Sequence, residues 1–434
     1  MKVLLVGSGA REHALAWKLR QSKLVDDLLI WPGSATMDVL GARLPMGLDA
    51  GMADVARLAR NMDVDFVVVG PEQPLADGFA DACAELKLPC FGPVAAAAQL
   101  ESSKAFAKDV MQAAGIPTAA FAVVQGEAAC RKKAEEYLAR SGGAVIKASG
   151  LASGKGVFVC QSQSDIDEGL KRLYQSGMAK AAETVVIEEV LVGRECSFFV
   201  FLGAGEPTAL GFAVDHKRLK DGDEGPNTGG MGCYTPVPWL PADAGDTVMQ
   251  RVVRPLLAEL KKRGLSYTGC LYVGLMWSDK GPAVVEFNVR LGDPEAEVLA
   301  LHDQRDWAEL IAAKVGLIPD NKEFEAAAAQ NAGASVCVVL ASPCYPYGEG
   351  TPQRFEVPRE VFQNSSHDNQ VFAAAVREEQ GRLMTGRGRL LTFVSHGKDF
   401  VEARRHAYAH IKKIAAHWHG VQYRHDIGAG LVEG

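Results

Sequence analysis

Short apolar runs alternate with amphipathic stretches along the first hundred residues. Strands are predicted at Val3 to Val6, Leu28 to Trp31 and Asp65 to Val69, and helices at Arg11 to Leu19, Met52 to Met62 and Ala76 to Leu88. Strands that alternate with helices are typical of a parallel sheet covered on both faces. The pattern therefore predicts an N-terminal doubly wound parallel α/β domain over residues 1–101.

The pattern becomes richer in strands after residue 101, where Ser102 or Ser103 can cap a new helix. Strands are predicted at Ala120 to Val124, Ala144 to Lys147, Val157 to Cys160, Val185 to Glu189, Cys196 to Leu202, Ala209 to Val214, Cys270 to Trp277 and Ala283 to Phe287, and helices at Glu127 to Arg140, Ser164 to Gln175, Asp246 to Arg263 and over most of Pro294 to Val315. We interpret residues 120–187 as a module inserted into a core formed by 102–119 and 188–325. A long polar loop, Asp215 to Gly232, interrupts this core.

The last hundred residues have a third pattern. Strands are predicted at Ala334 to Leu340, Val371 to Val376 and Leu390 to Val394, followed by an amphipathic helix from Phe400 to Ala416. Residues 326–434 are therefore predicted to form a small C-terminal α+β domain with antiparallel strands under helices.

Charge and composition narrow the classes of function. The 434 residues carry 46 Lys and Arg against 53 Asp and Glu, a net charge of −7, which argues against nucleic acid as a partner. Apolar runs stay well below the roughly 18 residues of a membrane span, so we expect no membrane partner. The nine cysteines are scattered and never spaced as C-x-x-C, which favours core thiols over disulfides or zinc. We expect a cytoplasmic monomer that acts on small molecules.

The turn from Gly7 to Glu12 follows a strand and opens a helix, as a dinucleotide fingerprint does. However, Glu12 stands where the third glycine belongs, and Pro32-Gly33 ends the second strand where a ribose-binding acid is expected. The free N–H groups of such a turn can still hold a phosphate of another ligand. An NAD-linked oxidoreductase is therefore disfavoured, and an ordinary turn remains an alternative.

The loop from Gly150 to Val157 has three glycines, a serine and Lys155 between two strands, and Lys147 lies on the strand before it. This composition lets backbone N–H groups and ammonium groups approach phosphate oxygens. It lacks the glycine and hydroxyl spacing of a Walker A loop. A surface lysine beside a hairpin tip is the alternative, but the combination favours a nucleotide.

Two acidic segments could complete a nucleotide site. Glu188-Glu189-Val190-Leu191, with Glu195 beyond it, joins two apolar strands and could offer backbone groups to adenine and a carboxylate to ribose; exposed hinge glutamates are the alternative. Glu286, Asn288 and Arg290 share one face of a strand end. Carboxylate and amide oxygens suit Mg²⁺, and a guanidinium holds phosphate or carboxylate oxygens. The presence of both metal-binding residues disfavours an inactive nucleotide-binding regulator.

Five motifs in order along the chain resemble the phosphoribosylamine–glycine ligases, ATP-grasp enzymes of purine biosynthesis. They are Gly9 to His13, Gly70-Pro71-Glu72, Lys147 to Leu151, Asp215 to Gly232 and Glu286 to Glu295. The resemblance implies an ATP-grasp core, in which the inserted module is a lid. It also implies that ATP phosphorylates the glycine carboxylate and that the amine of 5-phosphoribosylamine then displaces phosphate, giving glycinamide ribonucleotide.

The resemblance also assigns residues to roles. ATP would be bound by Lys104, Lys147, Ser153, Gly154, Lys155, Gly156, Glu188, Glu189, Val190, Leu191, Glu195, Arg218 and Asn227. Glycine and phosphoribosylamine would be bound by Gly9, Arg11, Glu12, His13, Gly70, Pro71, Glu72, Asp215, Arg290 and Asp293. Glu286 and Asn288 would bind Mg²⁺ or Mn²⁺, and Arg290 and Lys147 would be the catalytic residues.

Other ATP-grasp enzymes, such as N⁵-carboxyaminoimidazole ribonucleotide synthetases and biotin carboxylases, are the nearest alternatives. The loop Asp215 to Gly232 argues against both. The chain departs from the family pattern around residues 374–376 and 386–388 and at Leu291, where family members commonly have Phe. A metal cluster around His406 and His410 is disfavoured because Arg404, Arg405 and two lysines surround these histidines.

Overall fold

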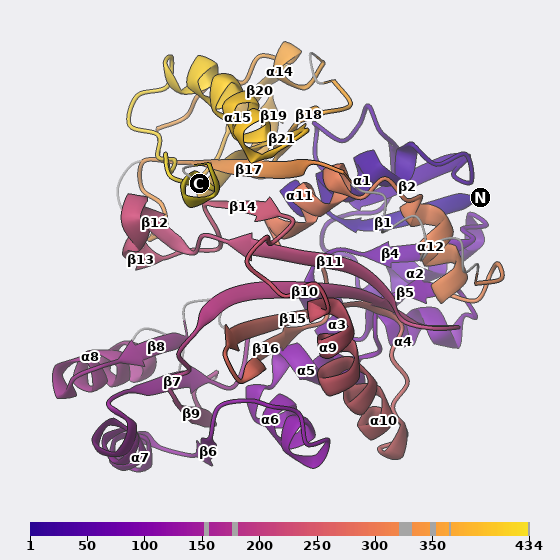
Figure 1. Cartoon of the computed structure of the whole chain (residues 1–434). Helices are drawn as coiled ribbons and strands as arrows, with labels where there is room; N and C mark the ends of the chain where they lie inside the picture. Colours follow the sequence, from indigo (N-terminus) through magenta and orange to yellow (C-terminus); the bar gives the residue numbers. More distant parts are fainter. Residues whose placement is uncertain (152–155, 176–180, 321–331, 348–352, 364–365, 433–434) are drawn as a thin grey trace.

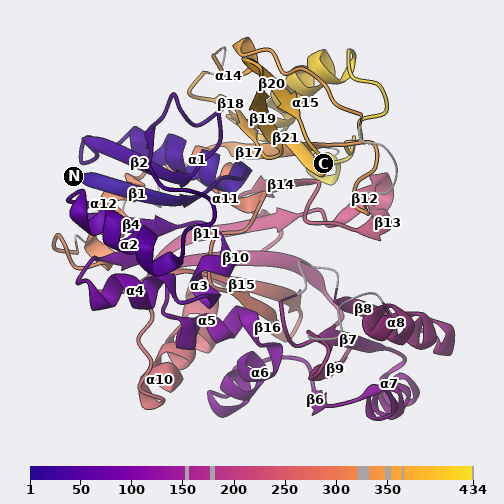
Figure 2. The ribbon, with the colours of Figure 1, turned by 180° about the vertical axis from the view of Figure 1, so that it is seen from behind.

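The computed structural model describes residues 1–151, 156–175, 181–320, 332–347, 353–363 and 366–432. The core runs through the middle of the molecule, and the N-terminal domain, the lid and the C-terminal unit lie around it (Figure 1). In the view from behind, the C-terminal unit, residues 334–432, lies above both the N-terminal domain and the core (Figure 2). Of the described helices, none is long and apolar enough to cross a bilayer.

The N-terminal domain has a parallel sheet with the strand order β3-β2-β1-β4-β5. Its elements are β1 (Lys2–Gly7), α1 (Ala10–Arg20), β2 (Asp27–Pro32), β3 (Ala42–Arg43), α2 (Met52–Asn61), β4 (Phe66–Val69), α3 (Glu72–Ala76), α4 (Phe79–Glu85) and β5 (Cys90–Phe91). The doubly wound prediction is confirmed. The single helix predicted over Ala76 to Leu88 is wrong, because Gly78 takes a left-handed conformation (φ 84°) and separates α3 from α4.

The lid is a four-stranded sheet of order β6-β9-β7-β8 with two helices. Its elements are β6 (Phe121–Val124), α7 (Glu127–Ser141), β7 (Ala144–Ala148), β8 (Val157–Cys160), α8 (Gln163–Gln175) and β9 (Val185–Glu189). Side chains of α7, α8 and the sheet form a separate apolar cluster that includes Tyr137, Ile146 and Leu170. The predicted strands and helices of this module are therefore present, and the module has its own core.

The core contributes strands to a long antiparallel sheet. Its elements are α5 (Ala95–Ser102), α6 (Lys104–Ala113), β10 (Arg194–Leu202), β11 (Thr208–Asp215), β12 (Arg218–Lys220), β13 (Glu224–Asn227), β14 (Gly232–Thr235), α9 (Ala244–Val248), α10 (Arg254–Lys262), β15 (Gly269–Ser278), β16 (Gly281–Asn288), α11 (Glu295–His302) and α12 (Trp307–Lys314). Ser103 caps α6 by accepting a hydrogen bond from the N–H of Phe106. A π-helical stretch, Met249–Val253, joins α9 to α10 just before Pro255, which has no N–H to donate.

The polar loop Asp215 to Gly232 contains a small β-hairpin. Strands β12 and β13 pair antiparallel, with Arg218 opposite Asn227 and Lys220 opposite Glu224. A one-turn 3₁₀ helix, Asp221–Asp223, forms the tip. The prediction of a plain loop is therefore wrong, because short polar strands show no apolar alternation in the sequence.

The C-terminal unit continues the sheet of the core. Its elements are β17 (Ala334–Ala341), α14 (Glu360–Gln363), β18 (Asn369–Ala373), β19 (Val376–Glu379), β20 (Arg382–Thr385), β21 (Arg389–Gly397), α15 (Phe400–Ala415) and a final 3₁₀ turn, Ala429–Leu431. Strands β14 and β17 pair over four residue pairs, so one eight-stranded sheet runs in the order β16-β15-β10-β11-β14-β17-β21-β18. The predicted strand Val371 to Val376 is wrong at its end, since β19 belongs to a separate pair with β20.

Candidate active site

The candidate residues come from the strand ends of the N-terminal sheet, the end of β16, the lid and the hairpin β12–β13. Figures 1 and 2 show these elements around the core sheet. Strand order in the N-terminal sheet reverses between β1 and β4, which is the position where α/β sheets bind ligands. Gly7 ends β1, and Gly70 directly follows β4. The two glycines therefore border the crevice at this reversal.

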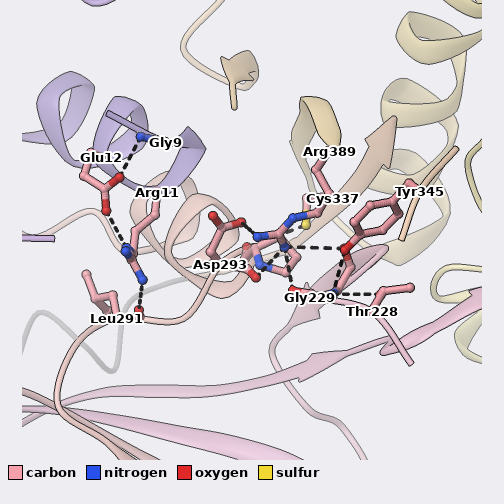
Figure 3. A network of polar contacts seen from close by, with 12 residues as sticks. Gly9, Arg11, Glu12, Thr228, Gly229, Leu291, Asp293, Cys337, Tyr345 and Arg389 are labelled. Atoms are coloured by element: carbon pink, nitrogen blue, oxygen red, sulfur yellow. Dashed lines mark hydrogen bonds and ion pairs between the residues drawn. The ribbon is translucent and has the colours of Figure 1, made fainter. Parts of the chain in front are cut away.

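The carboxylate of Glu12 fills the crevice between these strands. It accepts hydrogen bonds from the N–H of Gly9 (2.7 Å) and from Nε of Arg11 (2.6 Å), as Figure 3 shows. A Cβ at Gly7 would lie 2.2 Å from Glu12 Cγ, and one at Gly70 would lie 2.3 Å from Oε1. Glycine is needed at both positions because Glu12 is there, and this side chain occupies the space beside the turn where a dinucleotide fingerprint places its pyrophosphate. This packing argues against the NAD hypothesis.

A Gly70→Ala variant is expected to lose about 1–3 kcal/mol of unfolding free energy, because the new methyl group must displace the buried Glu12 side chain. Urea unfolding measures this loss. Gly245→Ala is the matched control, since no atom lies within 4 Å of its added Cβ. Equal stability of the two variants would contradict the packing described for Glu12.

His13 links helix α1 to the C-terminal unit. Its Nδ1 accepts a hydrogen bond from the N–H of Ala373 in β18 (3.0 Å), and its ring meets the edge of Phe372. An accepting Nδ1 places the proton of the neutral ring on Nε2. Burial lowers the pKa of His13 to about 4. The ring is therefore neutral at physiological pH.

Acid is expected to destabilise the fold through His13 and His302, whose pKa values burial lowers from 6.5 to about 4. Below pH 6.5 the unfolded chain binds protons that the folded protein does not, so stability falls between pH 6.5 and 4. Each histidine should cost about 2 kcal/mol at pH 5. Urea unfolding at pH 7 and pH 5 tests this. A His13→Gln variant should lose less stability on acidification than the parent protein; an equal loss would exclude His13 as a source.

Arg290 is held by two carboxylates. Its Nη2 lies 2.9 Å from Oε1 of Glu101, and its Nε lies 3.3 Å from Oε2 of Glu72. The other oxygen of Glu101 accepts from the N–H of Val289 at 2.8 Å. Burial favours the neutral acid at Glu72, yet Arg290 and Arg11 lower the pKa of this carboxyl below its ordinary value. Sequence reasoning missed Glu101, although an acid inside the apolar helix α5 was a signal.

The turn after β16 joins Arg290 to the N-terminal domain. Nη1 of Arg11 donates to the carbonyl oxygen of Leu291 (3.2 Å), and Nη1 of Arg290 donates to the same oxygen (3.1 Å). Both guanidinium groups are thereby fixed at one place (Figure 3 shows the Arg11 contact). The predicted substrate residues Arg11, Glu12, Glu72 and Arg290 are therefore brought together in space.

A second cluster surrounds Glu188 at the end of β9. Nζ of Lys147 lies 3.0 Å from its carboxylate and 3.2 Å from the carbonyl oxygen of Val285, and Nζ of Lys108 lies 3.2 Å from Oε2. Glu188 is only 2% exposed, so the alternative of an exposed hinge glutamate is wrong for this residue. Burial lowers the pKa of Lys108 to about 8, against the opposing effect of Glu188. Sequence reasoning missed Lys108.

Glu286 and Asn288 alternate with the buried Phe287 and Val289, so the two polar side chains share one face of the strand end, as predicted. Burial would raise the pKa of Glu286, but Lys217, Lys147, Lys104 and Arg290 together lower it. The carboxylate therefore stays charged among cations. Burial also lowers the pKa of Lys104, which Glu286 opposes. These two hard oxygen donors fit Mg²⁺ held mainly by phosphate oxygens and water, and the described residues include no larger His, Cys, Asp and Glu group arranged for a metal.

Lys217 lies between the acids of the loop and the nucleotide-side residues. Its ammonium pairs with Glu195. Although burial opposes protonation, Glu195, Tyr272, Glu286 and Asp215 raise the pKa of Lys217 well above its ordinary value. Burial, with the neighbouring Glu295, raises the pKa of Asp215. Sequence reasoning recognised the loop but did not single out Lys217.

Asp293 is held by Arg389 of the C-terminal unit. The two side chains lie 3.0 Å apart, and Nη1 of Arg389 donates to the carbonyl oxygens of Asp293 (2.7 Å) and Gly229 (2.5 Å). The N–H of Gly229 donates to the hydroxyl of Tyr345 at 2.8 Å (Figure 3). The C-terminal unit therefore holds the base of the loop, which no motif in the sequence predicted.

The remaining predicted site residues that the structure describes lie in the hairpin, at the end of β9, before β8 and after β4. Arg218 and Asn227 are exposed and opposite each other in the hairpin. Glu189, Val190 and Leu191 are half-buried at the end of β9, and Gly156 is buried before β8. Pro71 is half-buried beside Glu72. Ser153, Gly154 and Lys155 lie outside the described residues.

The arrangement of lid, core sheet and lysine-lined strand ends defines the class: an ATP-grasp enzyme. Family models match as follows: the phosphoribosylglycinamide synthetase N domain over residues 1–101, its ATP-grasp domain over 102–296 and its C domain over 335–430. The chain therefore belongs to the phosphoribosylglycinamide synthetase family.

Individual relatives agree with the family models. A phosphoribosylamine–glycine ligase of Rhizobium meliloti is 38% identical over 430 residues, covering 99% of this chain and 98% of the relative. The crystal structure of that ligase from Thermotoga maritima has a TM-score of 0.80 at 32% identity and covers 98% of this chain and 100% of its own. A biotin carboxylase of Campylobacter jejuni is 14% identical with a TM-score of 0.69, covering 100% of this chain and 95% of its own, which shows a shared fold alone.

Proposed function

We propose that this site joins glycine to 5-phosphoribosylamine, with ATP as the energy source. One cluster of charged residues would bind the nucleotide, and the other would bind glycine and phosphoribosylamine. The product is glycinamide ribonucleotide, released with ADP and phosphate, as a step of purine biosynthesis. Support comes from family membership over the whole chain and from the two charged clusters that flank β16. The one observation that carries the proposal is Glu286, a carboxylate kept ionised among four cationic side chains.

The nucleotide side is formed by the lid, the end of β9 and the hairpin. Lys147 and Lys104 face Glu286, so their ammonium groups lie where negative phosphate oxygens would gather. Ser153, Gly154, Lys155 and Gly156 of the predicted glycine loop would hold the phosphates with them. The segment Glu188 to Leu191, with Glu195, would hold the adenosine, and Arg218 and Asn227 would close over it from the hairpin.

Glu286 and Asn288 would hold Mg²⁺ or Mn²⁺ with the nucleotide. When bound, the metal supplies positive charge to the phosphate being transferred. Arg290 orients the glycine carboxylate beside this phosphate, because Glu72 and Glu101 fix its guanidinium. Attack of a carboxylate on a phosphate needs charge neutralisation and alignment more than a strong base.

The amine of phosphoribosylamine would then attack the glycyl phosphate from the N-terminal side. The Gly9 to His13 turn, Gly70 to Glu72, Asp215 and Asp293 would bind these two substrates. The amine is nucleophilic when neutral, so no side chain need become a covalent nucleophile. An acyl phosphate hydrolyses readily, and closure of the site against water protects it. We further propose a cytoplasmic monomer.

Release of ADP tests the proposal. Purified protein with MgATP should release ADP only when glycine and phosphoribosylamine, generated in situ, are both present. Omission of either substrate should reduce the rate to background, and bicarbonate should not replace glycine. ADP release that is independent of the amine, or that is supported by bicarbonate, would exclude this reaction.

A further inference from the structure

The segment Arg424-His425-Asp426 binds the tip of the hairpin β12–β13 through hydrogen bonds and ion pairs. Nη1 of Arg424 donates to Oδ1 of Asp223 (2.5 Å) and to the carbonyl oxygen of Arg218 (3.3 Å). Oδ2 of Asp426 accepts from the N–H of Gly222 at 2.8 Å. These contacts join residues about two hundred positions apart in the sequence, and all of them fall on the hairpin.

His425 and Ile427 make further contacts with the loop Asp215 to Gly232. The N–H and Nδ1 of His425 lie 2.7 and 3.0 Å from the two carboxylate oxygens of Asp221. Ile427 packs against Gly232, where a Cβ would lie 2.7 Å from Ile427 Cγ1. The loop therefore returns from the hairpin directly under the C-terminal segment.

The segment Arg424-His425-Asp426 is itself fixed to helix α15. The hydroxyl of Tyr408 donates to the carbonyl oxygen of Arg424 (2.8 Å) and accepts from the N–H of Ile427 (3.1 Å). Arg404 donates to the carbonyl oxygens of His425 (2.5 Å) and Ile427 (3.0 Å). The hairpin is therefore attached to a packed unit of the protein and not only to its own loop ends.

Arg424 is the centre of this contact. It is 1% exposed, and its Nε and Nη2 lie 2.7 and 2.6 Å from the oxygens of Asp426. Asp426 thus fixes the plane of the guanidinium, which leaves Nη1 for the hairpin. Asp223, by contrast, has a side chain that is 70% exposed, so it can be changed without disturbing a core.

The hairpin needs outside support. Its strands contain three and four residues with only two register pairs, and its tip gathers the acids Asp221, Asp223 and Glu224. A two-stranded hairpin of this length is not stable alone in water, and like charges at its tip repel. Without the C-terminal segment, ordering of the hairpin would have to be driven by the bound nucleotide, at the expense of affinity.

We propose that Arg424, fixed by Asp426, is a positioning residue for ATP, which holds the hairpin β12–β13 so that Arg218 and Asn227 face the nucleotide. This inference rests on the proposed roles of these two hairpin residues. It assigns the C-terminal segment a task in nucleotide affinity, although the segment lies outside the nucleotide site.

Two variants test the contact from opposite sides. Asp223→Asn removes the exposed acid, and Arg424→Lys keeps the charge but not the planar fork. Each should raise the KM for ATP by about five- to tenfold, with kcat and the KM for glycine within about twofold of the parent values. The double variant should be little worse than either single variant, because both changes break one interaction. Glu356→Gln is the control: its exposed ion pair with Arg382 lies in the same unit, away from the hairpin.

Trypsin reports on the hairpin directly, since Arg218 and Lys220 are cleavage sites on an exposed strand. Cleavage at these sites should be faster in both variants, while the melting temperature of Asp223→Asn stays near that of the parent protein. ATP should protect the parent protein more strongly than the variants at one nucleotide concentration. Calorimetry with ADP measures nucleotide affinity even if the parent protein failed the ADP-release test, so the two proposals can fail separately. An unchanged KM for ATP in both variants, or equal rises in the KM of all substrates, would overturn the positioning role.

Discussion

Glu286→Gln is expected to release ADP about a thousand-fold more slowly than the parent protein at saturating MgATP. The amide is nearly the same size, so the fold should remain intact, but the negative charge that faces Lys217, Lys147 and Lys104 is lost. A metal held only by two neutral amide oxygens, those of Asn288 and the new glutamine, would bind weakly. The charge of the phosphate would then not be neutralised during transfer. Stopped assays of ADP over a range of Mg²⁺ concentrations measure the effect.

Glu168→Gln is a matched control for this variant. Glu168 lies on the exposed face of the lid helix α8 and pairs with Arg172 four residues later. It should retain the activity of the parent protein. Near-normal turnover of Glu286→Gln at physiological Mg²⁺ would remove the metal-binding role of this residue, whereas partial recovery at high Mn²⁺ would support it.

Arg290→Met is expected to lower both stability and activity. Loss of the guanidinium leaves the buried Glu101 without its cation, which should cost about 3–5 kcal/mol of unfolding free energy. Burial already raises the pKa of Glu101, and Arg290 is the largest opposing influence. Turnover should fall about a thousand-fold, since the glycine carboxylate would no longer be oriented.

A double variant separates these two effects. In Arg290→Met/Glu101→Gln the buried acid is neutral, so most of the lost stability should return, while turnover should stay as low as in Arg290→Met. Urea unfolding and ADP release measure the two quantities on the same samples. Recovery of activity together with stability would show that Arg290 acts only through the fold.

Local patterns predicted the strands and the central motifs because both depend on neighbouring residues. Buried strands such as β1 and β4 are continuous apolar runs bounded by glycine. Glu286, Asn288 and Arg290 were predicted on one face because side chains alternate along a strand. The family resemblance then indicated that these segments meet.

The charge partners could not be predicted in the same way. Glu101, Lys108 and Arg389 each come from an element far along the chain from the residue that it contacts, and a single charged residue in a helix or strand gives no local signal of its partner. The hairpin was missed for a related reason. Its short polar strands are held by Arg424, whose contact depends on tertiary packing and not on local propensity.

The continuous eight-stranded sheet limits how the chain can be divided. A cut between the core and the C-terminal unit would separate β14 from β17 and leave two unpaired strand edges. The free N–H and C=O groups of each edge could then form hydrogen bonds with another chain. Fragments ending at such a cut should aggregate when expressed apart and recover their solubility when expressed together, by pairing across the missing junction. For circular permutation, new termini should be placed in the exposed turns of the lid, because a cut there leaves the eight-stranded sheet continuous.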